Sequence, residues 1–171
     1  MQNIEVKCPL RDRRKAEVRL EALGARKMWT RRQVDTFFRV PVRGSWLKLR
    51  ECEGRPAELI SYTRSTEDSR PRPSEYDVLI VKEPNDWKRL LSRVLPIDVV
   101  VAKERTLWIY EHTRVHLDAV EGLGEFIELE TVVDDFSEAE ARSEAERIIE
   151  VLAMDRGEFI AVPYRDLVAP R

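Results

Sequence analysis

Two carboxylates that could bind a metal ion lie close together in the stretch 118–130, Asp-Ala-Val-Glu-Gly-Leu-Gly-Glu-Phe-Ile-Glu-Leu-Glu. Its two glycines predict a tight turn between two strands. Because successive side chains of a strand point to opposite faces, Glu128 and Glu130 share a face, about 7 Å apart along the strand. Hard divalent cations prefer such oxygen ligands, although a solvated strand face is the simpler interpretation of this motif taken alone.

The same alternation recurs in other strands with the opposite charge. In residues 45–52, Leu47 and Leu49 take one parity, and Lys48 and Arg50 take the other. When the charged residues that lie opposite the apolar face of each predicted strand are collected, they form two sets. The cations are Lys7, Lys48, Arg50, Arg64, Lys103, Arg105 and Arg114, and the anions are Glu5, Glu75, Asp118, Glu128 and Glu130.

These two sets suggest a polar site. If the sheet closes with this face inside, neither set is stable there without partners. A polyanionic ligand would satisfy the cations, since arginine binds phosphate through two nitrogens and lysine binds it as a point charge. Carboxylates and phosphate oxygens are the usual ligands of Mg²⁺ or Mn²⁺. We therefore expect a phosphate ligand with a divalent metal.

The elements that position these residues are mostly strands. We expect about eight strands in antiparallel pairs and three helices, which is an α+β fold. The predicted strands fall in residues 3–8, 26–40, 45–52, 58–64, 74–81, 97–110, 112–119 and 126–131. The tail 159–168, which carries Tyr164, is expected to be extended or irregular.

The helices are predicted from apolar spacing and end signals. The first covers 11–23 and ends at Gly24, and the second begins at an Asn85 cap and ends near Arg93. Its expected buried residues are Trp87, Leu90, Leu91 and Val94. A capping box at Ser137 and Glu140 begins the third, which buries Ala141, Ala145, Ile148, Ile149 and Leu152. Trp108 is expected to be a packing residue.

Composition excludes several classes of protein. The 171 residues suit a single domain, 1–171, and the net charge of −2 gives no general attraction to nucleic acid or membrane. Cys8 and Cys52 do not have a metal-binding spacing, which favours a reducing compartment without disulfides. The sequence contains no signal peptide and no apolar run of membrane length, so we expect a cytoplasmic protein.

The ordered set of charged motifs resembles the CYTH domain, or triphosphate tunnel metalloenzymes, over nearly the whole chain. This family includes class IV adenylyl cyclases, thiamine triphosphatases and inorganic triphosphatases. Its opening Glu-x-Glu-x-Lys matches Asn3-Ile-Glu5-Val-Lys7, and its paired-cation strand matches Lys48 and Arg50. Its Lys-x-Arg matches Lys103 and Arg105, and its Asp, glycine turn and closing Glu-x-Glu match Asp118, Gly122, Gly124, Glu128 and Glu130. Arg64 falls at a basic position where lysine is commoner, and Glu75 falls at the central acidic position.

This resemblance implies a closed, eight-stranded antiparallel β-barrel with flanking helices, whose tunnel binds a triphosphate and Mg²⁺ or Mn²⁺. One departure is Asn3, which stands where the family has its first glutamate. Asparagine can give a metal its carbonyl oxygen but brings no charge, so we expect weakened or altered metal binding. The asparagine version is similar to the class IV adenylyl cyclase subgroup.

Three functions follow from the resemblance. The first is a class IV adenylyl cyclase, in which the ribose 3′-hydroxyl of ATP attacks the α-phosphorus and gives cyclic AMP and pyrophosphate. The second is a triphosphatase, in which water attacks inorganic triphosphate, thiamine triphosphate or a nucleoside triphosphate. The third is a non-catalytic binder of nucleotide or polyphosphate. A nucleic-acid polymer or a membrane is not expected as a partner, and both a monomer and a homodimer remain open.

The resemblance also assigns roles to the charged residues. Lys7 and Arg105 are the candidate catalytic residues. The expected triphosphate-binding residues are Lys7, Lys48, Arg50, Arg64, Lys103, Arg105 and Arg114. The expected metal ligands are Glu5, Glu75, Asp118, Glu128 and Glu130.

Overall fold

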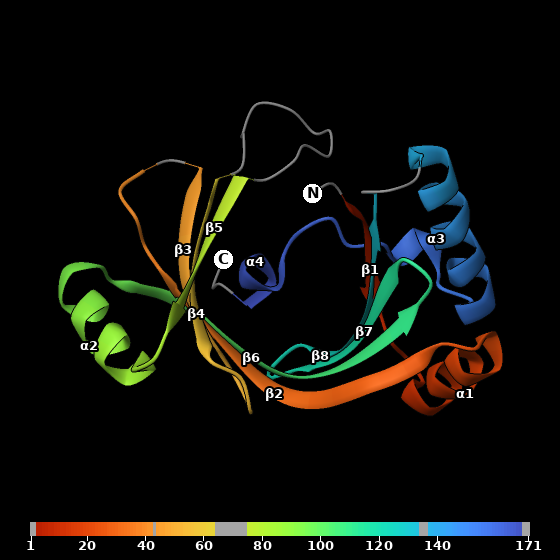
Figure 1. Ribbon diagram of the computed structural model, residues 1–171, viewed down its shortest axis with the longest axis horizontal. Helices are drawn as coiled ribbons and strands as arrows, with labels where there is room; N and C mark the ends of the chain where they lie inside the picture. Colours follow the sequence, from red (N-terminus) through yellow and green to blue (C-terminus); the bar gives the residue numbers. More distant parts are fainter. Residues whose placement is uncertain (1–2, 43, 64–74, 134–136, 169–171) are drawn as a thin grey trace. The chain divides into compact units, whose positions relative to one another are not determined.

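The computed structural model describes residues 3–42, 44–63, 75–133 and 137–168 (Figure 1). Over these residues the strands are β1 (Asn3–Pro9), β2 (Arg26–Phe38), β3 (Ser45–Cys52), β4 (Ala57–Thr63), β5 (Glu75–Val81), β6 (Ile97–Tyr110), β7 (Thr113–Val120) and β8 (Gly124–Val132). The helices are α1 (Arg13–Leu23), α2 (Pro84–Val94), α3 (Glu138–Leu152) and α4 (Tyr164–Val168), with a short 3₁₀ helix, η1, at Arg156–Glu158. None of the described helices is long and apolar enough to cross a membrane.

The strands form one eight-stranded sheet in the order β1-β8-β7-β6-β2-β3-β4-β5. The predicted α+β class, with eight antiparallel strands and flanking helices, is thus confirmed. The predicted closure into a barrel is wrong for the described residues, because β1 and β5 end the strand order and do not pair with each other. Alternation along each strand determines its two faces, but it carries no information about whether the two end strands meet.

The described residues divide into two compact units. The first unit contains the chain up to Thr30 together with Glu104–Val162, and the second contains Arg31–Lys103 and the segment from Pro163 onward. The long strands β2 and β6 contribute to both units. Each unit has its own apolar core and its own charged strand face, and each is described separately below.

In the first unit, α1 and α3 cover the apolar face of β1, β7 and β8. The core contains Cys8, Leu20, Trp108, Val115, Leu117, Ile127, Leu129, Ile148, Ile149 and Leu152. The predicted helix ends are confirmed: Gly24 closes α1 with φ of 88°, and Ser137 and Glu140 form the capping box of α3. All five predicted apolar residues of α3 are buried, and so is Trp108, which confirms its predicted packing role.

The turn between β7 and β8 requires glycine. Gly122 and Gly124 have φ of 77° and 99°, in the left-handed region that side chains disfavour. Val120 then pairs with Gly124, and this register places Glu128 opposite His116 and Glu130 opposite Arg114. The predicted strand, turn and strand over 118–130 is confirmed.

In the second unit, α2 packs differently from the prediction. It begins at Pro84 after Glu83, not at Asn85, and none of its residues is buried. Trp87, Leu90 and Val94 are exposed, and α2 reaches the core of Phe38, Leu49, Ala57 and Val81 only through Leu91 and the adjoining Leu95. The prediction of a broad buried face was wrong because the helix contacts this small core along a narrow edge. The expected irregular tail was also partly wrong, since Tyr164 begins the short helix α4.

Candidate functional site

The charged face of the first unit carries a set of residues that we call the carboxylate cluster. Its members lie on β1, β6, β7 and β8, on the parity opposite the apolar core. They are Glu5, Lys7, Arg105, Arg114, Asp118, Glu128 and Glu130. The register explains their proximity, since Glu5 lies opposite Glu130 and Lys7 lies opposite Glu128 in the β1–β8 ladder. Arg114 lies opposite the same Glu130 in the β7–β8 ladder.

Arg105 joins two of the carboxylates. Its Nε and one terminal nitrogen donate to Asp118 at 2.7 and 2.6 Å, and that nitrogen also donates to Glu128 at 2.7 Å. The Asp118 side chain is fully buried, so Arg105 supplies the charge that its carboxylate needs away from water. The fork of a guanidinium suits this bidentate geometry better than an ammonium group would.

Lys7 and His116 approach Glu128 from the neighbouring strands. The Lys7 ammonium lies 3.9 Å from Glu128, and the ring of His116 lies 3.6 Å from it. Burial lowers the pKa of Lys7, while Glu128 opposes that shift. Burial and the nearby Arg105 charge lower the pKa of His116, which favours a neutral ring.

Glu130 accepts a hydrogen bond at each of its carboxylate oxygens. Its carboxylate accepts from Arg114 at 2.8 Å and from the Asn3 amide at 2.8 Å. Like charges directly opposite in a ladder are destabilising, and Glu5 and Glu130 are such a pair. The Asn3 Oδ1 atom is buried without a hydrogen-bond partner among the described residues. Hard oxygen donors with an unsatisfied acceptor nearby suit Mg²⁺ or Mn²⁺.

The charged face of the second unit carries a set that we call the cation cluster, consisting of Lys48, Arg50, Lys103 and Asp35. Asp35 accepts from Arg50 at 2.8 and 3.0 Å and from Lys48 at 3.3 Å. Burial alone would raise the pKa of Asp35, but Lys48 and Arg50 outweigh it and hold that pKa well below its usual range.

Asp35 was missed in the sequence analysis, although a signal for it exists. Residues 33, 35 and 37 share a parity, and the ladder pairs Asp35 with Arg50 and Phe37 with Lys48. The alternation in β2 thus predicts that the Asp35 carboxylate lies on the same face of the sheet as Lys48 and Arg50.

Lys103 is buried against an aromatic ring from the C-terminal segment of the same unit. Its ammonium lies 4.8 Å from the centre of the Tyr164 ring, within the range of a cation–π interaction. Both side chains are less than a tenth exposed. The tyrosine therefore belongs to the surroundings of a predicted phosphate-binding cation.

Two predicted site residues cannot be placed. Arg64 lies outside the described residues. Glu75 begins β5, where its backbone pairs with Thr63, but its side chain is not described.

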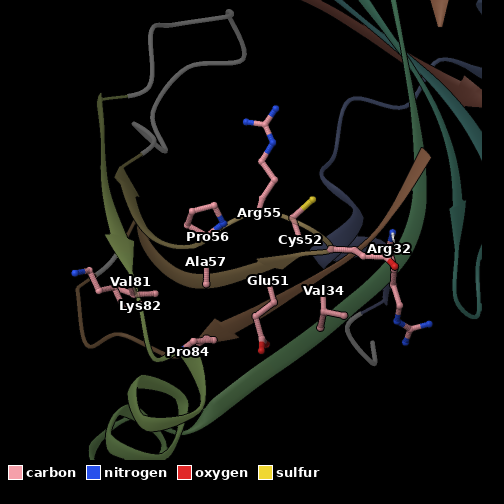
Figure 2. Close-up of a pocket in the computed structure, with 11 residues that line it drawn as sticks. Arg32, Val34, Glu51, Cys52, Arg55, Pro56, Ala57, Val81, Lys82 and Pro84 are labelled. Atoms are coloured by element: carbon pink, nitrogen blue, oxygen red, sulfur yellow. Dashed lines mark hydrogen bonds between the residues drawn. The ribbon is translucent and has the colours of Figure 1, made fainter. Parts of the chain in front are cut away.

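A separate cavity of about 750 Å³ lies in the second unit and contains none of the predicted site residues (Figure 2). It is lined by Arg32, Val34, Glu51, Cys52, Glu53, Arg55, Pro56, Ala57, Val81, Lys82 and Pro84. Val34, Ala57 and Val81 are apolar residues of its lining, while Arg55 points away from Glu51 in the view. Its chemistry differs from that of the two charged clusters.

The predicted carboxylates are not gathered into a compact set of ligand atoms. Within the described ranges, one group of three potential metal-binding side chains has its ligand atoms mutually within 4.8 Å, and it consists of Glu111, His112 and Glu144. The carboxylates of Asp118, Glu128 and Glu130 contact arginine side chains instead, as the fully buried charge of Asp118 requires.

Solved structures similar to this chain cover almost its whole length. The PH1012 protein of Pyrococcus horikoshii OT3 is 20% identical, with a TM-score of 0.82 over 98% of this chain and 99% of its own. A Vibrio parahaemolyticus protein provisionally named an adenylate cyclase is 17% identical, with a TM-score of 0.75 over 98% and 97%. HpAC1 of Hippeastrum, provisionally named an adenylyl cyclase and described as having a dominant triphosphatase activity, is 15% identical, with a TM-score of 0.67 over 98% and 94%. At these identities the likeness establishes the fold.

The family of the protein is identified from its sequence. No curated protein matches the chain. Residues 1–164 match the CYTH domain, and this range contains every residue of the carboxylate and cation clusters. The chain belongs to the CYTH domain family.

Proposed function

We propose that the protein is a divalent-metal-dependent enzyme that hydrolyses a triphosphate. The observation that carries the proposal is the β1–β8 ladder, in which Glu5 faces Glu130 and Lys7 faces Glu128. A divalent cation between Glu5 and Glu130 would relieve the repulsion of their like charges. Lys7 places a positive group for a phosphate oxygen beside that cation. Along β1 the proposed metal ligand Glu5 is thus followed two residues later by the proposed phosphate ligand Lys7.

The proposed roles of the carboxylates and of the basic side chains differ. Glu5, Asp118, Glu128 and Glu130 would hold the metal ion, which supplies charge neutralisation and activates a nucleophile when bound. Lys7, Arg105 and Arg114 bind phosphate oxygens next to these carboxylates, and Lys7 and Arg105 stabilise the charge that grows on the leaving phosphate. The family resemblance assigns Lys48, Arg50, Arg64 and Lys103 to the triphosphate and Glu75 to the metal ion.

Hydrolysis is favoured over cyclisation by the composition of the two clusters. Their residues suit phosphate and metal, and none of the contacts described above selects a purine base. Among the similar structures, HpAC1 is described as having a dominant triphosphatase activity. The proposed substrate class is a small triphosphate such as inorganic triphosphate, thiamine triphosphate or ATP.

Adenylyl cyclisation is the second candidate, as the asparagine form of the opening motif favours it. The Vibrio parahaemolyticus protein and HpAC1 have both been provisionally named as cyclases. In that reaction the same cations would hold the pyrophosphate leaving group, and the nucleophile would be the ribose 3′-hydroxyl instead of water.

A product assay distinguishes the alternatives. Purified protein is incubated with tripolyphosphate or ATP and with Mg²⁺ or Mn²⁺, and orthophosphate, pyrophosphate and cyclic AMP are quantified. Orthophosphate release without cyclic AMP supports hydrolysis, and equal amounts of cyclic AMP and pyrophosphate from ATP support the cyclase. Tight tripolyphosphate binding without turnover would contradict both and leave a binding protein.

A further inference from the structure

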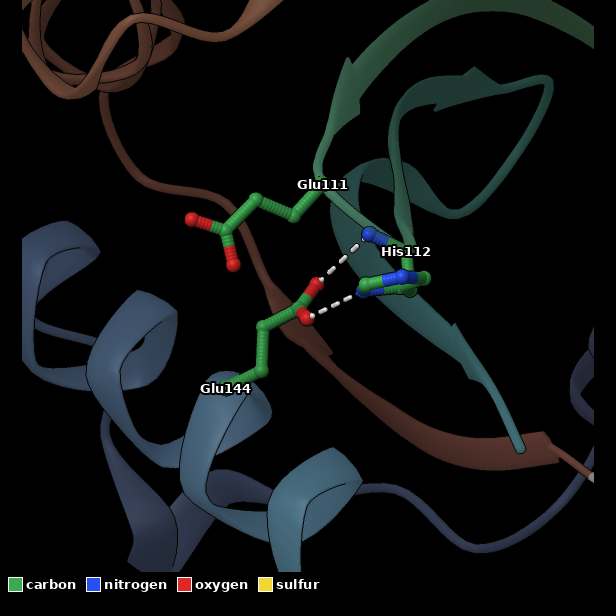
Figure 3. Close-up of side chains that lie close together, drawn as sticks. All are labelled: Glu111, His112 and Glu144. Carbon is green, nitrogen blue, oxygen red and sulfur yellow. Dashed lines mark hydrogen bonds and ion pairs between the residues drawn. The ribbon is translucent and has the colours of Figure 1, made fainter. Parts of the chain in front are cut away.

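A group of side chains that could hold a metal ion lies in the first unit on the helix-covered side of the sheet. Glu111 and His112 form the turn between β6 and β7, and Glu144 reaches them from α3 (Figure 3). The following residue, Thr113, has the same parity as the core residues Val115 and Leu117. This group is therefore separate from the carboxylate cluster, which lies on the opposite parity.

Two hydrogen-bond donors to one carboxylate oxygen hold the Glu144 side chain in place. Its side chain is only 6% exposed. Its Oε1 accepts from the His112 backbone nitrogen at 3.0 Å and from the Thr113 hydroxyl at 2.6 Å, and Thr113 contacts the Thr131 hydroxyl at 2.8 Å. Hydrogen bonds of this kind orient a metal-binding carboxylate, and here they aim Oε2 at the His112 ring.

The spacing of the second oxygen and the imidazole suits one shared metal ion. The Nδ1 atom of His112 lies 3.1 Å from Glu144 Oε2. Two ligands bound to one zinc ion at about 2.0–2.1 Å, with ordinary angles between them, are separated by roughly 2.9–3.4 Å. Both atoms can therefore bind one ion without a shift of the backbone. The imidazole binds in its neutral form with its hydrogen on Nε2, so the His112–Glu144 hydrogen bond is replaced by two metal bonds.

Glu111 is the third potential ligand, and Arg147 competes with a metal ion for its carboxylate. Glu111 is exposed and has φ of 45°, which places its backbone in the left-handed region within the turn. Its carboxylate pairs with Arg147 at 2.9 Å, and both side chains are about half exposed. An exposed ion pair contributes little free energy, so a divalent cation can replace the guanidinium.

We infer that Glu111, His112 and Glu144 form a binding site for Zn²⁺ or a similar transition-metal ion, with water completing the coordination. One imidazole nitrogen with two carboxylates favours zinc over Mg²⁺, whereas the oxygen donors of the carboxylate cluster favour Mg²⁺ or Mn²⁺. The site joins α3 to the β6–β7 turn. It is independent of the proposed triphosphate chemistry.

The two histidines of the chain make a direct test possible. His112 and His116 are the only imidazoles in the sequence, so a ¹⁵N-labelled protein gives two sets of ring signals. Zn²⁺ is titrated in the presence of excess Mg²⁺, and the signals are assigned with His112→Gln and His116→Gln. One equivalent of Zn²⁺ is expected to shift the His112 signals and leave those of His116, which lies beside Glu128, unchanged.

Variants and stability give a second readout. His112→Gln retains the backbone donor to Glu144 and should lose at least tenfold in zinc affinity by calorimetry, together with the zinc-dependent rise in melting temperature. Arg147→Gln should bind zinc several-fold more tightly, whereas Arg142→Gln, which loses an exposed pair with Glu138 on the same helix, should not. A zinc shift confined to His116, or equal affinity in wild type and His112→Gln, overturns the inference.

Discussion

Asp35 and Arg50 form a bidentate ion pair across the β2–β3 ladder, with the Arg50 nitrogens 2.8 and 3.0 Å from the two carboxylate oxygens. Asp35 is only 6% exposed, so its charge depends on this pair and on Lys48. One buried carboxylate thereby holds two predicted phosphate-binding cations side by side. The pair is a structural determinant of the cation cluster, and it leads to the first prediction.

Asp35→Asn should destabilise the protein by on the order of 3 kcal/mol at neutral pH, because it leaves two partly buried cations without their anion. Urea unfolding measures this change. Asp86→Asn removes an exposed pair with Arg89 and serves as the control, with an expected effect within about 0.5 kcal/mol. Equal effects of the two substitutions would contradict the buried-pair argument.

The contribution of Asp35 should depend on pH in a defined direction. Its folded pKa lies below the value of about 3.9 that an unfolded aspartate has. The ionised carboxylate therefore contributes its full stability above about pH 5, and this is lost as the pH falls toward the folded pKa. The difference in unfolding free energy between wild type and Asp35→Asn should shrink between about pH 5 and pH 2. A difference that stays constant over this range would show that Asp35 does not titrate as its contacts require.

Asn3→Asp should strengthen metal binding. The substitution replaces the amide that donates to Glu130 with a further carboxylate near the facing pair of Glu5 and Glu130. Mn²⁺ should bind about tenfold more tightly, or ~1.4 kcal/mol, as measured by electron paramagnetic resonance. Asn85→Asp adds the same charge at an exposed position of α2 and should leave the affinity unchanged. Unchanged binding in Asn3→Asp would place the metal away from Glu130.

Glu130→Gln should abolish metal-dependent turnover while the fold persists. The amide keeps the shape of the side chain but loses the charge that faces Glu5 and pairs with Arg114. Phosphate release is expected to fall at least a hundredfold, ~2.7 kcal/mol in transition-state stabilisation, with the circular dichroism spectrum retained. Glu138→Gln, exposed at the start of α3, is the matched control. Full activity in Glu130→Gln would refute the assignment of the metal ligands.

The two leucines of α2 should differ in their contribution to stability. Leu91 packs against the core of the second unit, whereas Leu90 is 55% exposed. Leu91→Ala should therefore cost about 1–2 kcal/mol, and Leu90→Ala should stay within about 0.5 kcal/mol. Thermal or urea unfolding of both variants checks this, and a larger loss for Leu90→Ala would show that it has a packing partner.

The local elements could be predicted from the sequence because their signals are local. Alternation set the two faces of β8, glycines at positive φ fixed its turn, and Ser137 with Glu140 marked the start of α3. Apart from Asp35, the residues of both clusters followed from the same alternation, since side-chain direction in a strand repeats every second residue. The motif order was also sufficient to suggest the CYTH family, which the match over residues 1–164 established.

The tertiary structure decided which of these residues become partners. The pairing of Asp35 with Arg50 depends on the β2–β3 register, and the contact of Glu144 with His112 depends on how α3 packs against the sheet. The exposure of Leu90 and Val94 depends on how much apolar surface the second unit offers to α2. Likewise, the open strand order from β1 to β5 is a property of the whole sheet. Periodicity and capping are set by neighbours along the chain, whereas register, burial and closure are set by residues far apart in sequence, and no single segment encodes them.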